Sequence, residues 1–252
     1  MAECMPDSLS ILGTHVSIFD SYGDAVELIR QRIRSHSSTF CVAINPEKVY
    51  RAKRNPRLRQ ALDSAHIGIC DGVGISLAAM LLYRRRLPRC TGIDLFLKLI
   101  RLASQEGWKV FLLGASPQSN EDASRALVST YPGVQIAGKL DGYFQDTAAV
   151  VATINRSGAD LLFVAMGSPR QELWIREQMP FLKTRFCMGI GGSLDVVSGA
   201  AKRAPVLFRT SGTEWLFRLL SDPSRLRRQM ALPLFLLEVL RAKGRGSILT
   251  RA

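Results

Sequence analysis

Three polar side chains stand close to the ends of short apolar runs that predict buried strands. Asn45 and Asp71 directly follow such runs, and Gln171 follows a third run after a Gly-Ser-Pro turn. Open α/β folds bind ligands at the carboxyl edge of their sheet, where backbone N–H groups and polar side chains collect. A carboxylate and two amides at one edge could orient a substrate and accept a proton from it.

Asp71 is the strongest candidate for chemistry. It ends the apolar run at residues 67–70, so we expect it to point into the crevice at the sheet edge. Partial desolvation there raises the pKa of a carboxylate and suits it to act as a general base. The alternative is structural, because Asp71 could instead cap the helix expected from about residue 74. The residues alone leave both interpretations open.

A second cluster precedes another expected helix. Arg89 suits a bidentate grip on phosphate, and the Thr91 hydroxyl and the Gly92 amide would add donors. Asp94 is interpreted as an acid at the helix start. The alternative to phosphate binding is a solvated basic loop, because three arginines stand nearby at residues 84–86.

Two glycine turns connect expected strands to helices. The turn at Gly114 could hold a nucleotide phosphate or ribose at a helix N-terminus. The turn at Gly167 leads into Gln171 and Glu172, and the plain alternatives are an ordinary connection and a helix-start acid. Neither turn has a dinucleotide or Walker A fingerprint. No D-x-D pair occurs and the three histidines are isolated, so we expect no metal site.

Strands and helices alternate along the first four fifths of the chain. The expected strands are residues 11–19, 39–44, 67–70, 109–113, 134–139, 161–166 and 186–189. Helices of ten or more residues between them predict an α/β fold with a Rossmann-like, mostly parallel sheet and helices on both faces. The alternation stops near Gly199. We therefore expect an α/β catalytic domain at residues 1–198 and a helical, basic C-terminal appendage at residues 199–252.

The formal net charge of +13 is concentrated in the appendage. From residue 199 onward, eleven Lys and Arg stand against three acidic residues, a surplus of eight. Two helices are expected there, at residues 213–220 and 224–240, and the second is basic and amphipathic. Such a helix can lie on an anionic membrane, but a helix packed on its own domain or on a partner subunit would look the same. The charge also suits nucleic acid or a phosphorylated substrate.

The cysteine pattern and the distribution of apolar residues indicate the cellular compartment of the protein. The five cysteines are scattered and lack a C-x-x-C pair, a pattern that favours a reducing compartment. We expect no signal peptide, because the first residues lack a basic segment followed by an apolar one. No window reaches the roughly 18 apolar residues of a transmembrane helix.

Taken together, a series of motifs resembles bacterial glycosyltransferase family 26, the WecG/TagA/CpsF family. The motifs are INPEK (44–48), CDGVG (70–74), RCTGIDL (89–95), FLLGASP (111–117), DGYF (141–144), MGSPRQE (166–172), GIGGSLD (189–195), KRAP (202–205) and EWLFRLLSDPSRLRR (214–228). They run in family order over roughly residues 10–230. Each motif alone is weak, and the combination is specific.

The resemblance implies an inverting, metal-independent enzyme without a cofactor that moves a sugar from a UDP-sugar to a polyprenyl-diphosphate-linked sugar in surface polysaccharide biosynthesis. The sugar would be N-acetylmannosamine, its uronic acid or glucose. The enzyme would be cytoplasmic and bound peripherally to the inner face of the cell membrane, with homo-oligomers possible by family analogy. Removing the chain from about residue 199 should then weaken both membrane association and turnover.

The resemblance also implies roles for single residues. By position, Asp71 resembles the catalytic base, Asn45 a polar pocket residue, and Arg89 and Gln171 active-site or donor-binding residues. The substrate-binding set would also include Thr91, Gly92, Gly114, Gly167 and the C-terminal arginines Arg203, Arg218, Arg225 and Arg228. The base would deprotonate the acceptor hydroxyl for in-line attack, while arginines and backbone amides stabilise the leaving group.

Two departures and two alternatives remain. Ala43 stands where family members often have Thr, and Leu194 replaces a frequent Phe, so the donor sugar is left open. The net charge suggests a non-enzymatic nucleic-acid-binding α/β protein as an alternative, but aromatic residues do not interleave with the basic run. A nicotinamide-dependent oxidoreductase is the third hypothesis, and it lacks the dinucleotide fingerprint.

Overall fold

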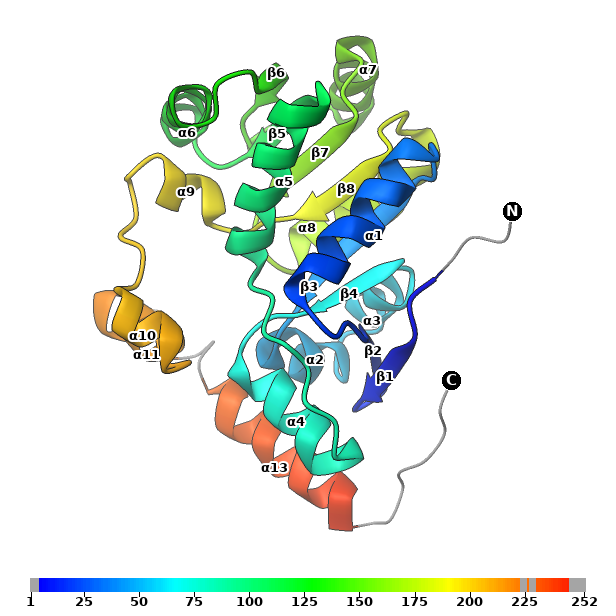
Figure 1. Ribbon diagram of the computed structural model, residues 1–252, viewed down its shortest axis with the longest axis vertical. Helices are drawn as coiled ribbons and strands as arrows, with labels where there is room; N and C mark the ends of the chain where they lie inside the picture. Colours follow the sequence, from blue (N-terminus) through cyan, green and yellow to red (C-terminus); the bar gives the residue numbers. More distant parts are fainter. Residues whose placement is uncertain (1–4, 223–225, 227–229, 245–252) are drawn as a thin grey trace.

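A six-stranded parallel sheet forms the centre of the computed structural model, which describes residues 5–222, 226 and 230–244 (Figure 1). The strand order is β4-β3-β8-β7-β5-β6, and every neighbouring pair is parallel. The strands are β3 (Thr39–Ile44), β4 (Ile67–Cys70), β5 (Lys109–Gly114), β6 (Gln135–Leu140), β7 (Leu161–Ala165) and β8 (Phe186–Gly189). The expected α/β class is confirmed.

Helices cover both faces of this sheet, as expected. The first face carries α2 (Pro46–Ala52), α3 (Pro56–Asp63), α4 (Val73–Tyr83), α7 (Thr147–Ser157) and α8 (Arg170–Gln178). On this side α13 (Ala231–Gly244) packs against α2 and α4. The second face carries α1 (Tyr22–Arg34), α5 (Gly92–Glu106), α6 (Pro117–Thr130) and α9 (Ser193–Val197). A short 3-10 helix, Met179–Phe181, follows α8.

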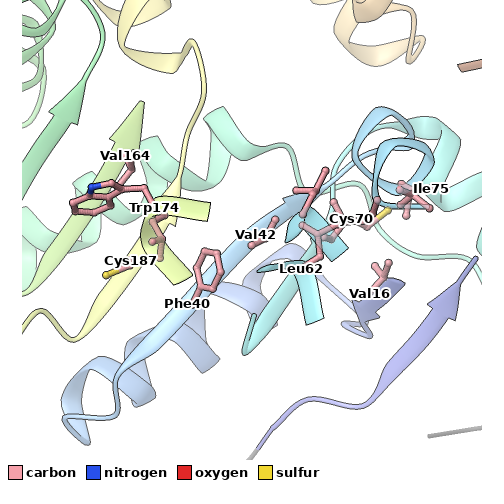
Figure 2. Close-up of a cluster of buried hydrophobic side chains, with 14 of the residues drawn as sticks. Val16, Phe40, Val42, Leu62, Cys70, Ile75, Val164, Trp174 and Cys187 are labelled. Carbon is pink, nitrogen blue, oxygen red and sulfur yellow. The ribbon is translucent and has the colours of Figure 1, made fainter. Parts of the chain in front are cut away.

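The alternation of side chains along each strand divides the core into two layers. In β3, Phe40 and Val42 join the core of the first face, whereas Cys41 and Ala43 join that of the second. Figure 2 shows the first layer, in which Trp174 of α8 lies among the strand residues. Because a strand buried on both faces needs apolar side chains on both, its sequence is a continuous apolar run. That is why these strands could be predicted from the sequence.

The first predicted strand, residues 11–19, is confirmed only at residues 11 and 14–17, and its assignment to the main sheet is wrong. The chain instead forms a hairpin of β1 (Ser8–Ile11) and β2 (Thr14–Ser17), separate from the main sheet. Leu12 and Gly13 both have positive φ and make the tight turn between the strands. The hairpin lies beside β4, where Ser17 Oγ accepts a hydrogen bond from the Gly68 backbone N–H at 3.1 Å. A Cβ on Gly68 would stand 2.7 Å from a hairpin carbonyl, so only glycine allows this contact.

The C-terminal region folds back onto the sheet domain. It contains α10 (Val206–Thr210), α11 (Glu214–Ser221) and α13, and α13 lies along α4 (Figure 1). The helix expected at residues 213–220 is confirmed by α11, and α13 contains the second half of the helix expected at 224–240. Phe235 and Val239 of α13 are buried in the first core layer. Across the described part of the chain, every helix is too short or too polar to cross a bilayer.

Candidate active site

The connections of the central strands mark a candidate binding edge at the carboxyl ends of β4, β3 and β8, called the crevice below. After β3 the chain enters α2 on the first face, whereas after the neighbouring β8 it enters α9 on the second face. A divergence of this kind is the switch point at which open α/β sheets bind ligands. Asn45 follows β3, Gly191 follows β8, and Asp71 follows the adjacent β4. The structure therefore brings these three residues to the same edge of the sheet, on neighbouring strands.

Asp71 is partly buried at this edge and does not cap the next helix. Its backbone N–H donates to the Ile44 carbonyl at 2.8 Å, which extends the β3–β4 ladder by one residue. The N-cap of α4 is Gly72, with φ of 93°, and no side chain makes a cap hydrogen bond there. The structural alternative for Asp71, an N-cap, is therefore wrong, and the residue stands at the carboxyl end of β4.

Asn45 has a structural task in addition to its place at the crevice. Its Oδ1 accepts a hydrogen bond from the Lys48 backbone N–H at 2.9 Å and caps α2. Within the described residues, its Nδ2 group makes no hydrogen bond. The amide is thus held in one orientation by the helix, with its two donors directed away from the cap.

The N-terminus of α5 lies over β3 and β8, where Gly92 faces Ala43 and Met188. Thr91 caps this helix, accepting from the Asp94 backbone N–H at 3.3 Å while its hydroxyl bonds the Asp94 carboxylate at 2.6 Å. A Cβ on Gly92 would come within 3.2 Å of the Ala43 Cβ in β3. The glycine therefore lets the helix approach the sheet closely, which brings the Arg89–Asp94 cluster to the crevice.

Two ion pairs join this cluster to the C-terminal region. Arg89 Nη2 lies 2.7 Å from Glu214 Oε2 at the start of α11, and Arg203 pairs with Asp94. Asp94 is therefore more than the helix-start acid that the sequence indicated. Arg89 and Arg203, two of the arginines predicted at the site, thus stand at the N-terminus of α5, each beside a carboxylate.

An open groove of about 470 Å³ begins at the same cluster and continues along α5. Its lining residues are Tyr22, Arg89, Thr91, Asp94, Leu97, Lys98, Arg101 and Tyr131. The Lys98 Nζ atom lies 4.5 Å from the centroid of the Tyr22 ring, a cation–π contact. The groove gives the crevice a basic extension on the second face of the sheet.

Gln171 belongs to a buried network rather than to an open wall. Its Nε2 donates to Glu172 Oε1 at 2.9 Å, and its Oε1 accepts from the Gly191 backbone N–H at 3.0 Å. Glu172 also pairs with Lys48, whose Nζ lies 2.9 Å from Glu172 Oε1. The interpretation of Glu172 as only a helix-start acid is wrong. Sequence reasoning missed Lys48, and the signal available was a lysine one turn into a helix that follows a buried strand.

The two predicted glycine turns have backbone tasks. Gly114 has φ of 120°, and a Cβ there would stand 2.4 Å from the Ala165 carbonyl oxygen, so β5 and β7 approach too closely for any side chain. Gly167 has φ of 73°, and its carbonyl accepts from the Gln171 N–H at 3.0 Å as α8 begins. Gly114 lies four strands from β4, roughly 19 Å from the Asp71 end of the sheet.

For three of the predicted arginines, the structure does not describe the position of the side chain. Arg218 lies in α11, but its side chain is outside the described part, and Arg225 and Arg228 lie outside the described residues altogether. Their roles stay predictions. Among the C-terminal arginines predicted to bind substrate, Arg203 is the one whose side-chain contacts are described.

The thiols near the crevice are buried and free. Burial raises the pKa of Cys41 and of Cys70 to about 12, and it also raises the pKa of Cys90. No disulfide joins the four cysteines of the described chain, which include Cys187. Nor do three His, Cys, Asp or Glu side chains gather into a possible metal site among those residues.

Comparison with known proteins identifies the family. The model of the glycosyl transferase WecG/TagA/CpsF family matches residues 9–248. A similar protein, the N-acetylglucosaminyldiphosphoundecaprenol N-acetyl-beta-D-mannosaminyltransferase of Bacillus spizizenii, is 36% identical over 206 residues. That match covers 82% of this chain and 80% of the relative. Because the family model spans the strand ends and the α5 cluster within a match over most of the chain, the chain belongs to the WecG/TagA/CpsF family of glycosyl transferases.

Proposed function

We propose that this glycosyl transferase moves a sugar from a UDP-sugar to a polyprenyl-diphosphate-linked sugar, with inversion at the anomeric carbon and without a metal. The name of the Bacillus relative supports the substrate classes, since it describes a mannosaminyltransferase that acts on a diphosphoundecaprenol-linked sugar. The observation that carries the proposal is the place of Asp71, a partly buried carboxylate at the switch-point crevice that caps no helix.

In the proposed reaction, Asp71 removes the proton from the acceptor hydroxyl as its oxygen attacks the anomeric carbon. The bond from that carbon to the diphosphate oxygen breaks in line, and UDP leaves with the electron pair. A single displacement inverts the configuration and requires no covalent intermediate with the protein. The carboxylic acid formed on Asp71 then returns its proton to solvent.

The leaving diphosphate would be stabilised at the N-terminus of α5. The Thr91 and Gly92 backbone and the helix dipole favour an anion there. Arg89 and Arg203 stand beside this terminus, each paired with a carboxylate. A diphosphate that displaced Glu214 or Asp94 would gain a bidentate partner, which is how arginines can replace a divalent cation.

The acceptor's lipid implies a membrane surface, and the distribution of apolar side chains supports one. Large exposed apolar residues gather on α4 and in the C-terminal helices: Val73, Leu77, Met80, Val206, Leu207, Trp215, Leu220, Leu234, Leu236, Leu237 and Leu240. Exposed cations flank them at Arg84, Arg85, Arg86, Arg241 and Lys243. Apolar patches edged with basic residues suit peripheral binding to anionic lipid. We therefore propose a peripheral enzyme at the inner face of the cell membrane.

The deciding experiment is a UDP-release assay with a panel of UDP-sugars and a polyprenyl-diphosphate-linked sugar on anionic vesicles. We expect release that depends on both the acceptor and one donor, with UDP-N-acetylmannosamine as the first donor to try because of the relative's name. The assay with excess chelator should give the same rate. No UDP release with any donor in the panel would refute the proposal.

Family membership makes the chain an enzyme and speaks against the non-enzymatic nucleic-acid-binding alternative. The proposed role of the C-terminal region is tested by removing residues 199–252. Turnover on the lipid acceptor should fall sharply because Arg203 and Glu214 at the crevice are lost with the membrane surface. Unchanged turnover would show that this region does not complete the site. Formation of homo-oligomers stays a prediction.

A further inference from the structure

The most deeply buried ion pair described in this chain lies beside the carboxyl end of β3. The side chains of Lys48 and Glu172 are 7% and 1% exposed, and Lys48 Nζ lies 2.9 Å from Glu172 Oε1. Lys48 Nζ also donates to the Ala43 carbonyl at 2.7 Å. The pair thus connects the end of β3 to the first turn of α8.

Stability alone does not explain this pair. Removing two charges from water costs free energy that their attraction repays only when the remaining hydrogen-bonding groups are satisfied, and apolar residues of similar volume are often as good or better. Glu172 Oε1 receives both Lys48 and Gln171, whereas Glu172 Oε2 is buried with no hydrogen-bond partner within the described residues. A carboxylate satisfied on one side only is a poor stabiliser of a fold.

The pair does determine which way the Gln171 amide faces. Glu172 Oε1 can only accept, so Gln171 must direct Nε2 towards it. The Oε1 atom of Gln171 is then presented to the Gly191 backbone N–H, at 3.0 Å. With the amide turned by half a rotation, two N–H groups would face each other and the Gly191 contact would be lost.

The site is built closely around this orientation. A Cβ on Gly189 would stand 2.5 Å from Gln171 Nε2, so β8 itself leaves room for the amide. Gly191 belongs to the turn between β8 and α9, on the opposite side of the crevice from Asn45. One line of contacts therefore connects Ala43 of β3 through Lys48 and Glu172 to Gln171 and the β8–α9 turn.

We propose that Lys48 and Glu172 are positioning residues, whose ion pair orients the Gln171 amide and thereby fixes the β8–α9 turn at the edge of the crevice. The proposal rests on the proposed function, because the position of the turn matters for transfer between UDP-sugar and acceptor. Neither residue needs to touch a substrate. Misplacement of a pocket wall by a fraction of an ångström is sufficient to slow a reaction that depends on orientation.

The test compares Lys48→Met, Glu172→Met and the double variant in the full-length chain. Each single variant leaves one charge buried alone, so both melting temperature and turnover should fall. In the double variant the melting temperature should return to near the wild-type value, while kcat stays at least tenfold below it. Recovery of kcat together with stability would mean that the pair is only structural, and would overturn the proposal.

A second measurement does not depend on activity. Amide hydrogen exchange of a peptide covering the β8–α9 turn, including Gly191, should be at least tenfold faster in the stable double variant than in the wild type. Unchanged exchange would overturn the positioning role whatever the kinetics. If the wild type itself transfers no sugar while exchange accelerates as expected, the proposed function fails and the positioning role stands.

The chain offers a matched control on the same helix. Arg57 of α3 and Glu177 of α8 form an ion pair at 2.9 Å, but their side chains are 71% and 47% exposed. Arg57→Met with Glu177→Met should leave melting temperature, kcat and exchange of the turn near the wild-type values. Equal effects in the control and in the Lys48–Glu172 double variant would overturn the specific role of the buried pair.

Discussion

The sheet and the C-terminal helices bury their apolar side chains to very different extents. Every residue of β3 and of β7 is buried, whereas α13 buries Ala231, Phe235 and Val239 and exposes most of its leucines. A strand between two layers of helices buries its apolar side chains against other parts of the same chain. The leucine-rich outer side of α13 has no such cover within the described residues. The difference indicates that one region is built around its own core and the other for contact with a further surface.

The two regions meet through charges as well as apolar contacts. Arg89–Glu214, Arg203–Asp94 and Lys53–Glu238 all cross between them. The first two lie at the crevice, where a phosphorylated substrate would compete for the arginines. Contacts of this polar kind can rearrange at lower cost than a packed core.

The largest effect should come from the sheet region. Asp71→Asn removes the proposed base, so transfer should fall by about 10²–10⁴-fold while vesicle binding is unchanged. The assay is UDP release with donor and lipid acceptor in excess. Asp20→Asn is the control, because the Asp20 side chain is 92% exposed and its ion pair with Arg85, at 3.5 Å, lies on the surface. A variant at Asp71 with wild-type turnover would contradict its role as base.

Glycine substitutions should separate the tightly packed region from the open one. Gly114→Ala forces a Cβ to 2.4 Å from the Ala165 oxygen at a φ of 120°, and should lower the free energy of unfolding by about 3 kcal/mol. Gly244→Ala meets nothing within 4 Å at the end of α13 and should change it by less than about 1 kcal/mol. Denaturant titration measures both. Similar losses at the two sites would remove the contrast.

Charges placed on the exposed apolar side of α13 should prevent membrane binding. Leu237→Glu with Leu240→Glu alters side chains that are 43% and 50% exposed, so folding should be retained. Binding to anionic vesicles should weaken at least tenfold because both desolvation and anionic lipid oppose the new charges. Val128→Glu with Phe181→Glu adds the same charge at exposed apolar positions outside this surface and should have no effect. Equal losses would show that net charge alone governs binding.

The smallest effect concerns pH. The hydrogen bond from Lys53 to Glu238, at 2.5 Å, lowers the pKa of Glu238 below its ordinary 4.5. A lowered carboxyl pKa contributes stability that is present above 4.5 and is lost as the pH falls below it. Glu238→Gln should therefore lower the melting temperature slightly at pH 7 and hardly at all at pH 3. An equal difference at both values would contradict the linkage.

The sequence predicted what depends on local patterns and missed what depends on distant partners. The central strands, the β3–α2 boundary at Asn45 and the place of Asp71 follow from apolar runs and their ends. The hairpin turn at Leu12 and Gly13 was missed because alternation continues across it. The Lys48–Glu172 pair was missed because its members lie far apart in the chain and are joined only when β3 and α8 pack. The counter-ion of Arg89 was hidden for the same reason.

A single residue, Gly72, separates Asp71 from α4, the helix whose outer side exposes Val73, Leu77 and Met80. On the proposed function, the helix that meets the lipid also carries the base. The height of the carboxylate above the bilayer is then set by the chain itself rather than by the substrate. Such an enzyme would select acceptors by the distance between the membrane and the reacting hydroxyl. A hydroxyl one sugar ring further from the lipid diphosphate would lie beyond the reach of Asp71.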